Sequence, residues 1–441
     1  MKIKSKRPQA ATALAFALAC MCATGILLPP RAGAGGPLIH LIQGYVQESV
    51  AGRSDNLDSL LFHRQTLHLE GSGDFSRRVS FRIEGDVLRD DADFQTDGAE
   101  IHSRLREAYV KFRFRDFDLR LGRMQVGWGE ADGLIVSDQV SPLDLTYFIV
   151  PEFDEIRLGV DGATLDYYFA DGTELQLLWI GKFTSPDFAV SDSPWSFVDT
   201  DVFTALGLSI AATEEPAANI SNSEFGLRIS GHPAAADWSL GYLRSWDDRP
   251  ALRLSGTSLV PVHKMFDLLT ANLAWPVAKV MLRVDSAYEH GRLLSNTTAA
   301  STAAAGFVSR EDLWRTLVGV DLKPDFEWWP QADVSLQVAY ERVMGNPQPL
   351  LASDNQQTLA ILRLAAGYAN DTIKPWVLAV ADLAGDNAWV QAKVDWTPAD
   401  GWRLSLEADA FFGHAYDGTN GGIYGRFADN DMVSTTVRYS F

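Results

Sequence analysis

Hydrophobic and polar residues alternate along most of this chain, in segments of about 9 to 13 residues. In residues 77–88, for example, Phe81 and Ile83 alternate with Arg82 and Glu84. Because successive side chains of a β-strand point to opposite faces of its sheet, this pattern predicts strands with one apolar and one charged face. Such strands form either a membrane barrel around a wet interior or a soluble β-sandwich, and alternation alone does not separate the two.

Connection lengths favour the barrel. Short polar turns, such as 115–116 and 399–401, alternate with long loops, such as 128–159 and 182–222, with a short exception at 383–386. Bacterial transmembrane barrels have short periplasmic turns and long outer loops, whereas a Greek-key sandwich has no reason to sort its connections in this way.

The predicted fold class is therefore all-β, a closed antiparallel transmembrane β-barrel of about eighteen strands. Sixteen strands is the alternative, because 41–50, 173–181 and 372–382 alternate poorly or contain a proline, Pro375. The eighteen segments are 41–50, 60–72, 77–88, 102–114, 117–127, 160–169, 173–181, 223–231, 237–246, 264–275, 278–290, 312–323, 332–343, 356–368, 372–382, 387–397, 402–412 and 432–441.

The first 34 residues have the pattern of a cleaved signal peptide. Basic residues precede an apolar run, Ala11–Leu28, and the small residues 32–34 fit a cleavage site. A membrane anchor and a lipoprotein acylated at Cys20 are the alternatives. Residues 35–441 show no linker or shift in composition, so we expect a single barrel domain there. Both cysteines lie in the first 34 residues, so this domain has no disulfide.

The charge balance excludes one class of partner. Without the five basic residues of the first 34, the chain has 57 acidic and 33 basic residues, a net charge of −24. Such acidity argues against nucleic acid as a partner. Beyond the signal peptide no apolar run reaches 18 residues, so no helical membrane span is expected.

The chain ends on an alternating strand. Val437, Tyr439 and the terminal Phe441 share one face, and Arg438 lies on the other. This ending resembles the C-terminal signal by which the barrel assembly machinery recognises outer-membrane barrels. The resemblance implies the outer membrane of a Gram-negative cell, with outer-membrane lipid and that machinery as partners. A homo-oligomer is also compatible with the sequence.

No motif for catalysis or for a cofactor is present. The histidines form no HxxH or HExxH pair, and no GxSxG, Walker or dinucleotide-binding pattern appears. We therefore expect no enzyme, no metal and no cofactor. A barrel hydrolase with a site assembled from distant strands remains an alternative. So does a non-conducting barrel that binds or assembles something at the surface through 182–222 and 291–311.

Basic residues gather on four neighbouring predicted strands, the second to the fifth. Adjacent strands lie about 4.8 Å apart, so these bases would form a ladder along one wall of the lumen. A ladder of this kind favours anions in a pore, although it also serves simply to keep the lumen hydrated. The predicted basic wall comprises Arg64, His68, Arg78, Arg82, Lys111, Arg120 and Arg123.

The loop 128–159 mixes acids with many apolar residues, which a free outer loop does not need. We predict that it folds into the lumen as a constriction; the alternative is an outer lid that packs on itself. A calcium site is conceivable, but its aspartate spacing matches no known loop. The predicted constriction residues are Trp128, Glu130, Asp132, Asp138, Asp144 and Asp154.

The same stretch carries a family resemblance. The run 121–133, with Pro142-Leu143-Asp144 and the segment 151–154, is similar to a bacterial outer-membrane family of unknown function. It resembles alginate-export porins more loosely. The motif covers roughly residues 117–195 and implies an outer-membrane barrel with an inner loop that serves hydrophobic or acidic solutes. It implies no catalytic residues. The sequence thus predicts an outer-membrane porin for small anionic or amphipathic solutes.

Overall fold

The computed structural model describes residues 38–90, 101–129, 134–191, 193–198, 200–233, 236–296, 307–345, 350–351, 353–418 and 420–441. The predicted signal peptide lies outside these residues. Within them, no helix is long and apolar enough to span a bilayer.

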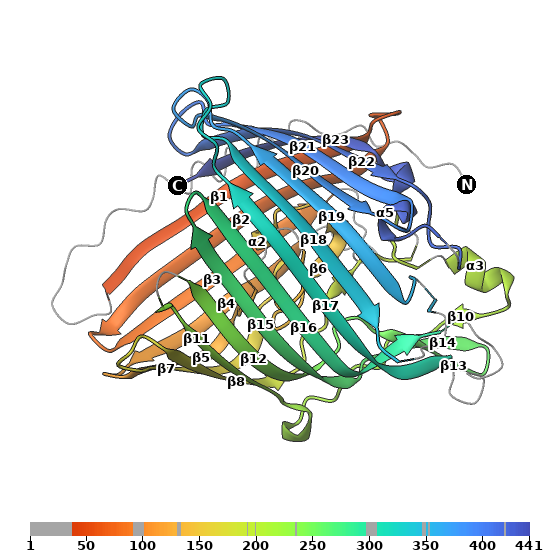
Figure 1. Ribbon diagram of the computed structural model, residues 1–441, viewed down its shortest axis with the longest axis horizontal. Helices are drawn as coiled ribbons and strands as arrows, with labels where there is room; N and C mark the ends of the chain where they lie inside the picture. Colours follow the sequence, from red (N-terminus) through yellow and green to blue (C-terminus); the bar gives the residue numbers. More distant parts are fainter. Residues whose placement is uncertain are drawn as a thin grey trace.

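Eighteen strands form one closed antiparallel sheet, which confirms the predicted barrel and its strand number (Figure 1). Each strand pairs with the next along the chain, and the last pairs with the first. The strands are β1 (Leu38–Arg53), β2 (Leu60–Ser76), β3 (Val79–Asp90), β4 (His102–Arg113), β5 (Phe117–Met124), β7 (Val160–Tyr168), β8 (Glu174–Lys182), β11 (Glu224–Gly231), β12 (Asp237–Trp246), β15 (Met265–Val277), β16 (Val280–Ser295), β17 (Val308–Leu322), β18 (Asp333–Val343), β19 (Gln356–Ala365), β20 (Ile373–Asp382), β21 (Asn387–Trp396), β22 (Trp402–Phe412) and β23 (Met432–Ser440).

The C-terminal strand closes the barrel. The backbone N–H of Phe441 donates to the carbonyl of Gly44 at 2.9 Å, and the N–H of Gly44 donates back at 3.1 Å. Arg438 turns into the lumen and donates to Gln47 at 2.5 Å. Because side chains alternate along a strand, Val437 and Tyr439 face outward.

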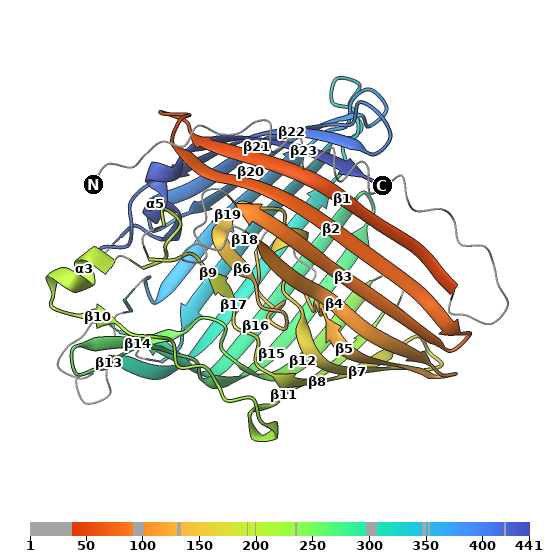
Figure 2. The same ribbon diagram turned by 180° about the vertical axis from the view of Figure 1, so that it is seen from behind.

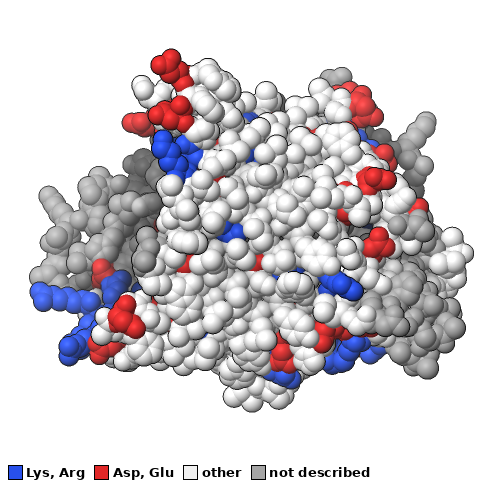
Figure 3. All heavy atoms as spheres, in the orientation of Figure 1, with Lys and Arg blue, Asp and Glu red and all other residues white. Residues whose placement is uncertain are grey.

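The outer surface of the wall is apolar. Large hydrophobic side chains that alternate with luminal residues are exposed there, including Leu227, Leu240, Val318, Leu336 and Leu406. Figure 3 shows a face that is largely uncharged across its middle, with most charged side chains toward the edges. A closed sheet with such a belt satisfies its backbone internally and is suited to lipid.

Smaller elements lie in the loops between strands. They are β6 (Asp144–Ile149), α2 (Phe153–Ile156), β9 (Asp187–Phe188), α3 (Thr200–Ala205), β10 (Ser209–Ile210), η1 (Ile220–Asn222), β13 (Ala251–Ser255), β14 (Ser258–Val262), α5 (Ile423–Arg426) and η3 (Ala428–Asn430). We call the barrel end that carries these long loops the loop end, and the opposite end the turn end.

Candidate functional site: a cavity beside a lumen-crossing segment

Residues 128–129 and 134–159, here called the luminal segment, run inside the barrel; β6 is visible within it in Figure 2. The segment begins at Trp128, whose indole Nε1 donates to Oε1 of Gln176 on β8 at 2.8 Å. The indole packs against two glycines of the wall. A Cβ at Gly226 or Gly241 would lie 2.6 or 3.2 Å from the ring. Glycine at these two positions therefore makes room for the anchor.

The segment next contacts β16. The Ser137 hydroxyl donates to Asp285 at 3.2 Å, and the Gln139 side-chain amide donates to Glu289 at 2.8 Å. Both acceptors are buried on the luminal face of β16. The first part of the segment is thus held against one side of the barrel.

The segment then crosses to β3 and β4. Asp144 forms an ion pair with Arg104 of β4 at 2.6 Å, and the Tyr147 hydroxyl donates to Asp90 of β3. Phe148 follows and packs among aromatic rings of β21, β22 and the loop before β23. Its ring centroid lies 4.8 to 6.3 Å from those of Trp389, Phe411, Tyr424 and Phe427.

Acids fix the last part of the segment to a third side of the barrel. Glu152 pairs with Lys393 of β21 at 3.0 Å and with Arg403 of β22 at 3.2 Å, and Glu155 pairs with Arg438 of β23. Burial raises the pKa of Glu152, but Lys393 and Arg403 outweigh burial and lower it to about 2. The luminal segment is therefore anchored around most of the barrel's circumference.

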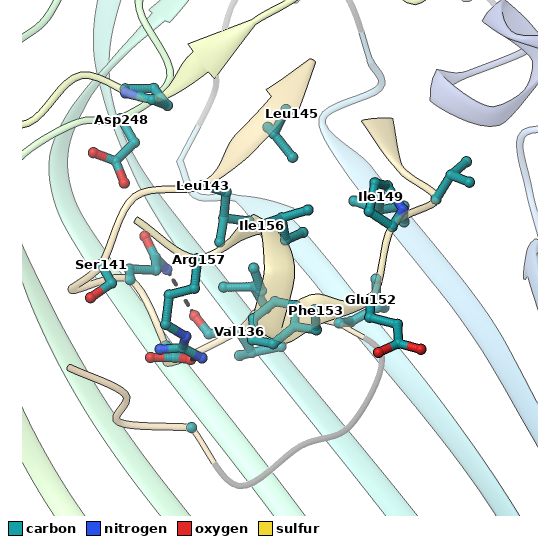
Figure 4. A pocket seen from close by; sticks show the side chains of 18 of the residues that line it. Val136, Ser141, Leu143, Leu145, Ile149, Glu152, Phe153, Ile156, Arg157 and Asp248 are labelled. Carbon is teal, nitrogen blue, oxygen red and sulfur yellow. Dashed lines mark hydrogen bonds and ion pairs between the residues drawn. The ribbon is translucent and has the colours of Figure 1, made fainter. Parts of the chain in front are cut away.

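A cavity of about 970 Å³ remains between the luminal segment and strands β15 to β22. One side of it is apolar and comes mostly from the luminal segment. Figure 4 shows these side chains between Asp248 on one side and Glu152 on the other. We call this set the apolar face: Leu143, Leu145, Ile149, Phe153 and Ile156.

The opposite side of the cavity is cationic. We call it the arginine face: Arg249, Arg283, Arg292, Arg315 and Arg363. Arg283 and Arg292 are nine positions apart on β16, roughly 30 Å of strand. Arg249 lies beyond β12 at the loop end. The arginine face therefore extends along much of the barrel's length.

Four of these arginines pair with acids. Three of the acids are partly exposed: Asp321 lies 2.6 Å from Arg283, Asp333 lies 3.9 Å from Arg363, and Glu341 lies 2.5 Å from Arg315. The other two acids are buried. Arg292 pairs with Asp247 at 2.5 Å and with Glu289, and Arg315 pairs with the same Glu289 at 3.0 Å. The side chains of Asp247 and Glu289 are 3% and 0% exposed. A solute in the cavity therefore has little access to these two negative charges.

The other arginines are more accessible. The side chains of Arg363 and Arg283 are 40% and 23% exposed. Arg249 is exposed, and its side chain has no partner among the described residues. The surrounding protein, and then the charges of Arg292 and Arg315, lower the pKa of Arg249 to about 10. Arg249 thus remains charged at neutral pH.

The predicted basic wall lies elsewhere, and most of its members are neutralised within the wall. Arg82 of β3 contacts three acids, Glu70, Glu84 and Glu107, at 2.6, 2.7 and 2.6 Å. Lys111 pairs with Asp118 at 2.7 Å, Arg120 with Asp166 at 3.2 Å, and His68 with Asp86 at 2.7 Å. None of the seven predicted bases lines the cavity.

The other three predicted bases, Arg64, Arg123 and Arg78, each lie in a different environment. Arg64 lies over the ring of Tyr147, 5.3 Å from its centroid. Arg123, at the loop end of β5, pairs with Asp161 at 3.0 Å. Arg78 is exposed in the two-residue turn between β2 and β3, so its prediction as a luminal residue is wrong; β3 begins only at Val79.

Of the six predicted constriction residues, Glu130 and Asp132 lie outside the described residues. Asp138 lines the cavity and pairs with Arg157. Trp128 and Asp144 are buried in anchoring contacts, and Asp154 is exposed, with its carbonyl accepting from Arg106.

Sequence reasoning missed the arginine face. Residues 283 and 315 were expected on luminal faces, but without a bias of charge. Arg292 follows a register shift in β16 after Glu289, which brings both side chains to the luminal face three positions apart. A two-residue period places them on opposite faces, so no simple pattern reveals Arg292.

Comparison with known proteins agrees with this architecture. Residues 65–441 match the model of the family described as "Protein of unknown function (DUF1302)". No curated protein matches the sequence. Among solved structures, Acinetobacter baumannii OccAB1 is similar at 12% identity, with a TM-score of 0.51, over 91% of this chain and 95% of that one.

Two Pseudomonas aeruginosa proteins are similar to the same degree. OccD3 (OpdP) shares 10% identity over 95% of this chain and 97% of its own, with a TM-score of 0.51. The outer membrane protein opdK shares 10% identity over 91% and 98%, with a TM-score of 0.52. At such identities the likeness concerns the fold. The family match covers most of the chain, and the protein belongs to the DUF1302 family of outer-membrane-type β-barrels.

Proposed function

We propose that this protein is an outer-membrane channel through which small solutes, preferentially anions, pass along the cavity beside the luminal segment. The observation that carries the proposal is the arginine face, where five arginines line the wall of a large cavity and one of them, Arg249, has no side-chain partner among the described residues. Fixed positive charge along a passage lowers the energy of an anion within it.

The outer-membrane location is supported by the apolar belt and by the closed sheet. An eighteen-stranded barrel lies in the size range in which the lumen holds an aqueous passage unless a loop narrows it. The outward placement of Val437 and Tyr439 on the closing strand also fits recognition by the barrel assembly machinery. No catalytic step is part of the proposal.

A constriction by residues 128–159 is supported by their anchoring. Trp128, Asp144 and Glu152 tie the luminal segment to β8, β4 and β21 respectively. With those contacts in place, the space left for a solute would be the cavity against β15 to β22. In this proposal the passage runs along the arginine face and not along the predicted basic wall.

Preference for anions is supported by the balance of accessible charge. Asp248 is the acid beside Arg249 at the loop end of the cavity. Burial, followed by the charges of Glu224 and Asp247, raises the pKa of Asp248 well above its usual range. Arg249 itself has no side-chain partner among the described residues, so its charge is open to a solute.

The test is current through single barrels in planar lipid bilayers. We expect stepwise conductance and, in asymmetric potassium chloride, a reversal potential that favours chloride. The double variant Arg249→Gln plus Arg363→Gln should shift this potential toward potassium. The matched control, Arg120→Gln plus Asp166→Asn, should leave it nearly unchanged, because it removes a whole ion pair of the other wall and does not change the net charge.

Two outcomes would contradict the proposal. Correctly folded barrel that carries no current would favour the non-conducting alternative, a barrel for surface binding or assembly. Current with no chloride preference, unaffected by the Arg249 and Arg363 changes, would remove the role of the arginine face.

A further inference from the structure

We infer that the cavity is a saturable binding site for amphipathic monoanions, molecules with one carboxylate and a compact apolar body. This inference rests on the proposed function for its route of access, but it concerns recognition rather than passage. It follows from the juxtaposition of the apolar face and the arginine face across a single cavity.

The first argument is the apolar face itself. In a water-filled lumen, exposed hydrophobic side chains raise the free energy unless something covers them. Phe153 is 42% exposed, and Leu143, Leu145 and Ile149 are only half-buried. Ile149 packs against the main apolar cluster of the luminal segment and the wall, whereas Leu143, Leu145 and Phe153 are not part of that cluster. These three side chains are therefore available to an apolar solute.

The second argument is the placement of charge. Arg249 is exposed, has no side-chain partner among the described residues and lines the cavity together with Arg292 and Arg315. Because Arg292 and Arg315 are already paired, the unpaired guanidinium of Arg249 provides a site for one carboxylate. A second carboxylate would have to lie on the apolar face, where burial without a partner is costly.

The third argument is the shape of the site. A volume of about 970 Å³ is at the upper end of the range, about 300 to 1,000 Å³, typical of small-molecule sites. Such sites combine a predominantly apolar lining with a few convergent polar groups, as this cavity does. A purely hydrophilic anion would leave the apolar face uncovered, and a neutral hydrocarbon would leave the arginines without a counter-charge.

Titration calorimetry on the whole barrel, purified in amphipol, tests the inference without requiring conduction. The probe is 4-phenylbutyrate. Its comparisons are the neutral 4-phenylbutanol, the cationic 4-phenylbutylamine and acetate, which has the charge without the apolar body. We expect saturable binding of 4-phenylbutyrate alone. Equal binding of the alcohol or of the amine, or equal binding of acetate, would overturn the proposal.

Two variants test the contributions of the arginine face and the apolar face separately. Arg249→Gln removes the unpartnered cation and should weaken 4-phenylbutyrate about tenfold or more, the effect of losing one charged hydrogen bond. Phe153→Ser removes an aromatic ring from the apolar face and should weaken the binding of 4-phenylbutyrate to a similar degree. The control Arg253→Gln changes an arginine four positions beyond Arg249 that pairs with Glu214 outside the cavity, and should have no effect.

The same measurements separate this inference from the proposed function. Binding that depends on Arg249 in a barrel without current would refute the channel and retain the site. Anion-selective current in a barrel that does not bind 4-phenylbutyrate would retain the channel and refute the site. Because Arg249 and Phe153 are both exposed, neither change is expected to prevent folding, which circular dichroism of each variant checks.

Discussion

The two long walls of the lumen are both rich in arginine and in acids, yet they differ in how completely their bases are paired. On β2 to β5, Arg82 alone contacts three acids, Glu70, Glu84 and Glu107. On the other wall, Arg249 at the loop end has no side-chain partner among the described residues. The first wall is neutral to a passing solute, and the second carries an unpaired positive charge.

The comparison shows that luminal charge depends on pairing rather than on composition. A carboxylate within reach of an arginine neutralises it and competes with any anion in the lumen. An arginine without such a partner keeps its charge available to a solute. Interactions between partly buried charges are also screened less by salt than interactions between exposed ones. Two walls of similar sequence content can therefore differ in selectivity.

Deleting residues 134–156 should have the largest effect, because it removes the luminal segment that keeps the two walls apart. We expect single-channel conductance to rise several-fold, since an unfilled barrel of this strand number leaves a wide aqueous lumen. Chloride preference should fall, because the neutral wall then contributes to the passage. Circular dichroism of the deleted barrel controls for folding, and an unchanged conductance would mean that the segment does not narrow the pore.

The next largest effect is expected on the free energy of unfolding, when one buried acid and one accessible acid are replaced in separate variants. Glu289→Gln leaves Arg292 and Arg315 short of their common partner and should destabilise the barrel by about 3 kcal/mol, as breaking a buried ion pair does. Glu70→Gln should cost less than about 1 kcal/mol, because Arg82 keeps two other acids and is partly exposed. Urea unfolding in lipid vesicles measures both changes, and equal losses would contradict the difference in depth.

The two walls also show which features could be predicted from the sequence. Alternation and connection lengths were enough for all eighteen strands, because both follow directly from the geometry of a barrel. They also predicted Arg82, Lys111 and Arg120 on one wall of the lumen. Which acids pair with each of these bases depends on side-chain packing, which no sequence pattern encodes.

Register shifts are a second reason why the sequence does not reveal some luminal arginines. In β4, a shift opposite Glu84 and Gly85 turns Arg106 into the lumen, where it pairs with Glu84 at 3.1 Å. The shift in β16 acts on Arg292 in the same manner. Both arginines fall on the outward face when a strict period of two is assumed. The anchors of the luminal segment, by contrast, depend on contacts between residues 40 to 283 positions apart.

Acidification should have the smallest effect and tests how the luminal segment is held against β21 and β22. The pKa of Glu152, about 2, lies below its ordinary value of 4.5 because Lys393 and Arg403 outweigh burial. A carboxyl group with a lowered pKa stabilises the folded state above its unfolded pKa and loses that contribution as the pH falls through the folded value. The anchor should therefore hold from pH 7 to about pH 5 and weaken only between about pH 4.5 and pH 2.

Hydrogen exchange of residues 145–158 as a function of pH measures this anchor. In the wild type we expect constant relative protection down to about pH 4.5 and rising exchange, after correction for the intrinsic rate, below it. Glu152→Gln should show the loosened state already at pH 7 and little further change on acidification, because no charge remains to titrate at that position. Loosening of the wild type near pH 6 would point to a histidine and not to Glu152. Because Glu152 and Lys393 both line the cavity, Glu152→Gln also leaves Lys393 without its nearest carboxylate and should raise chloride preference.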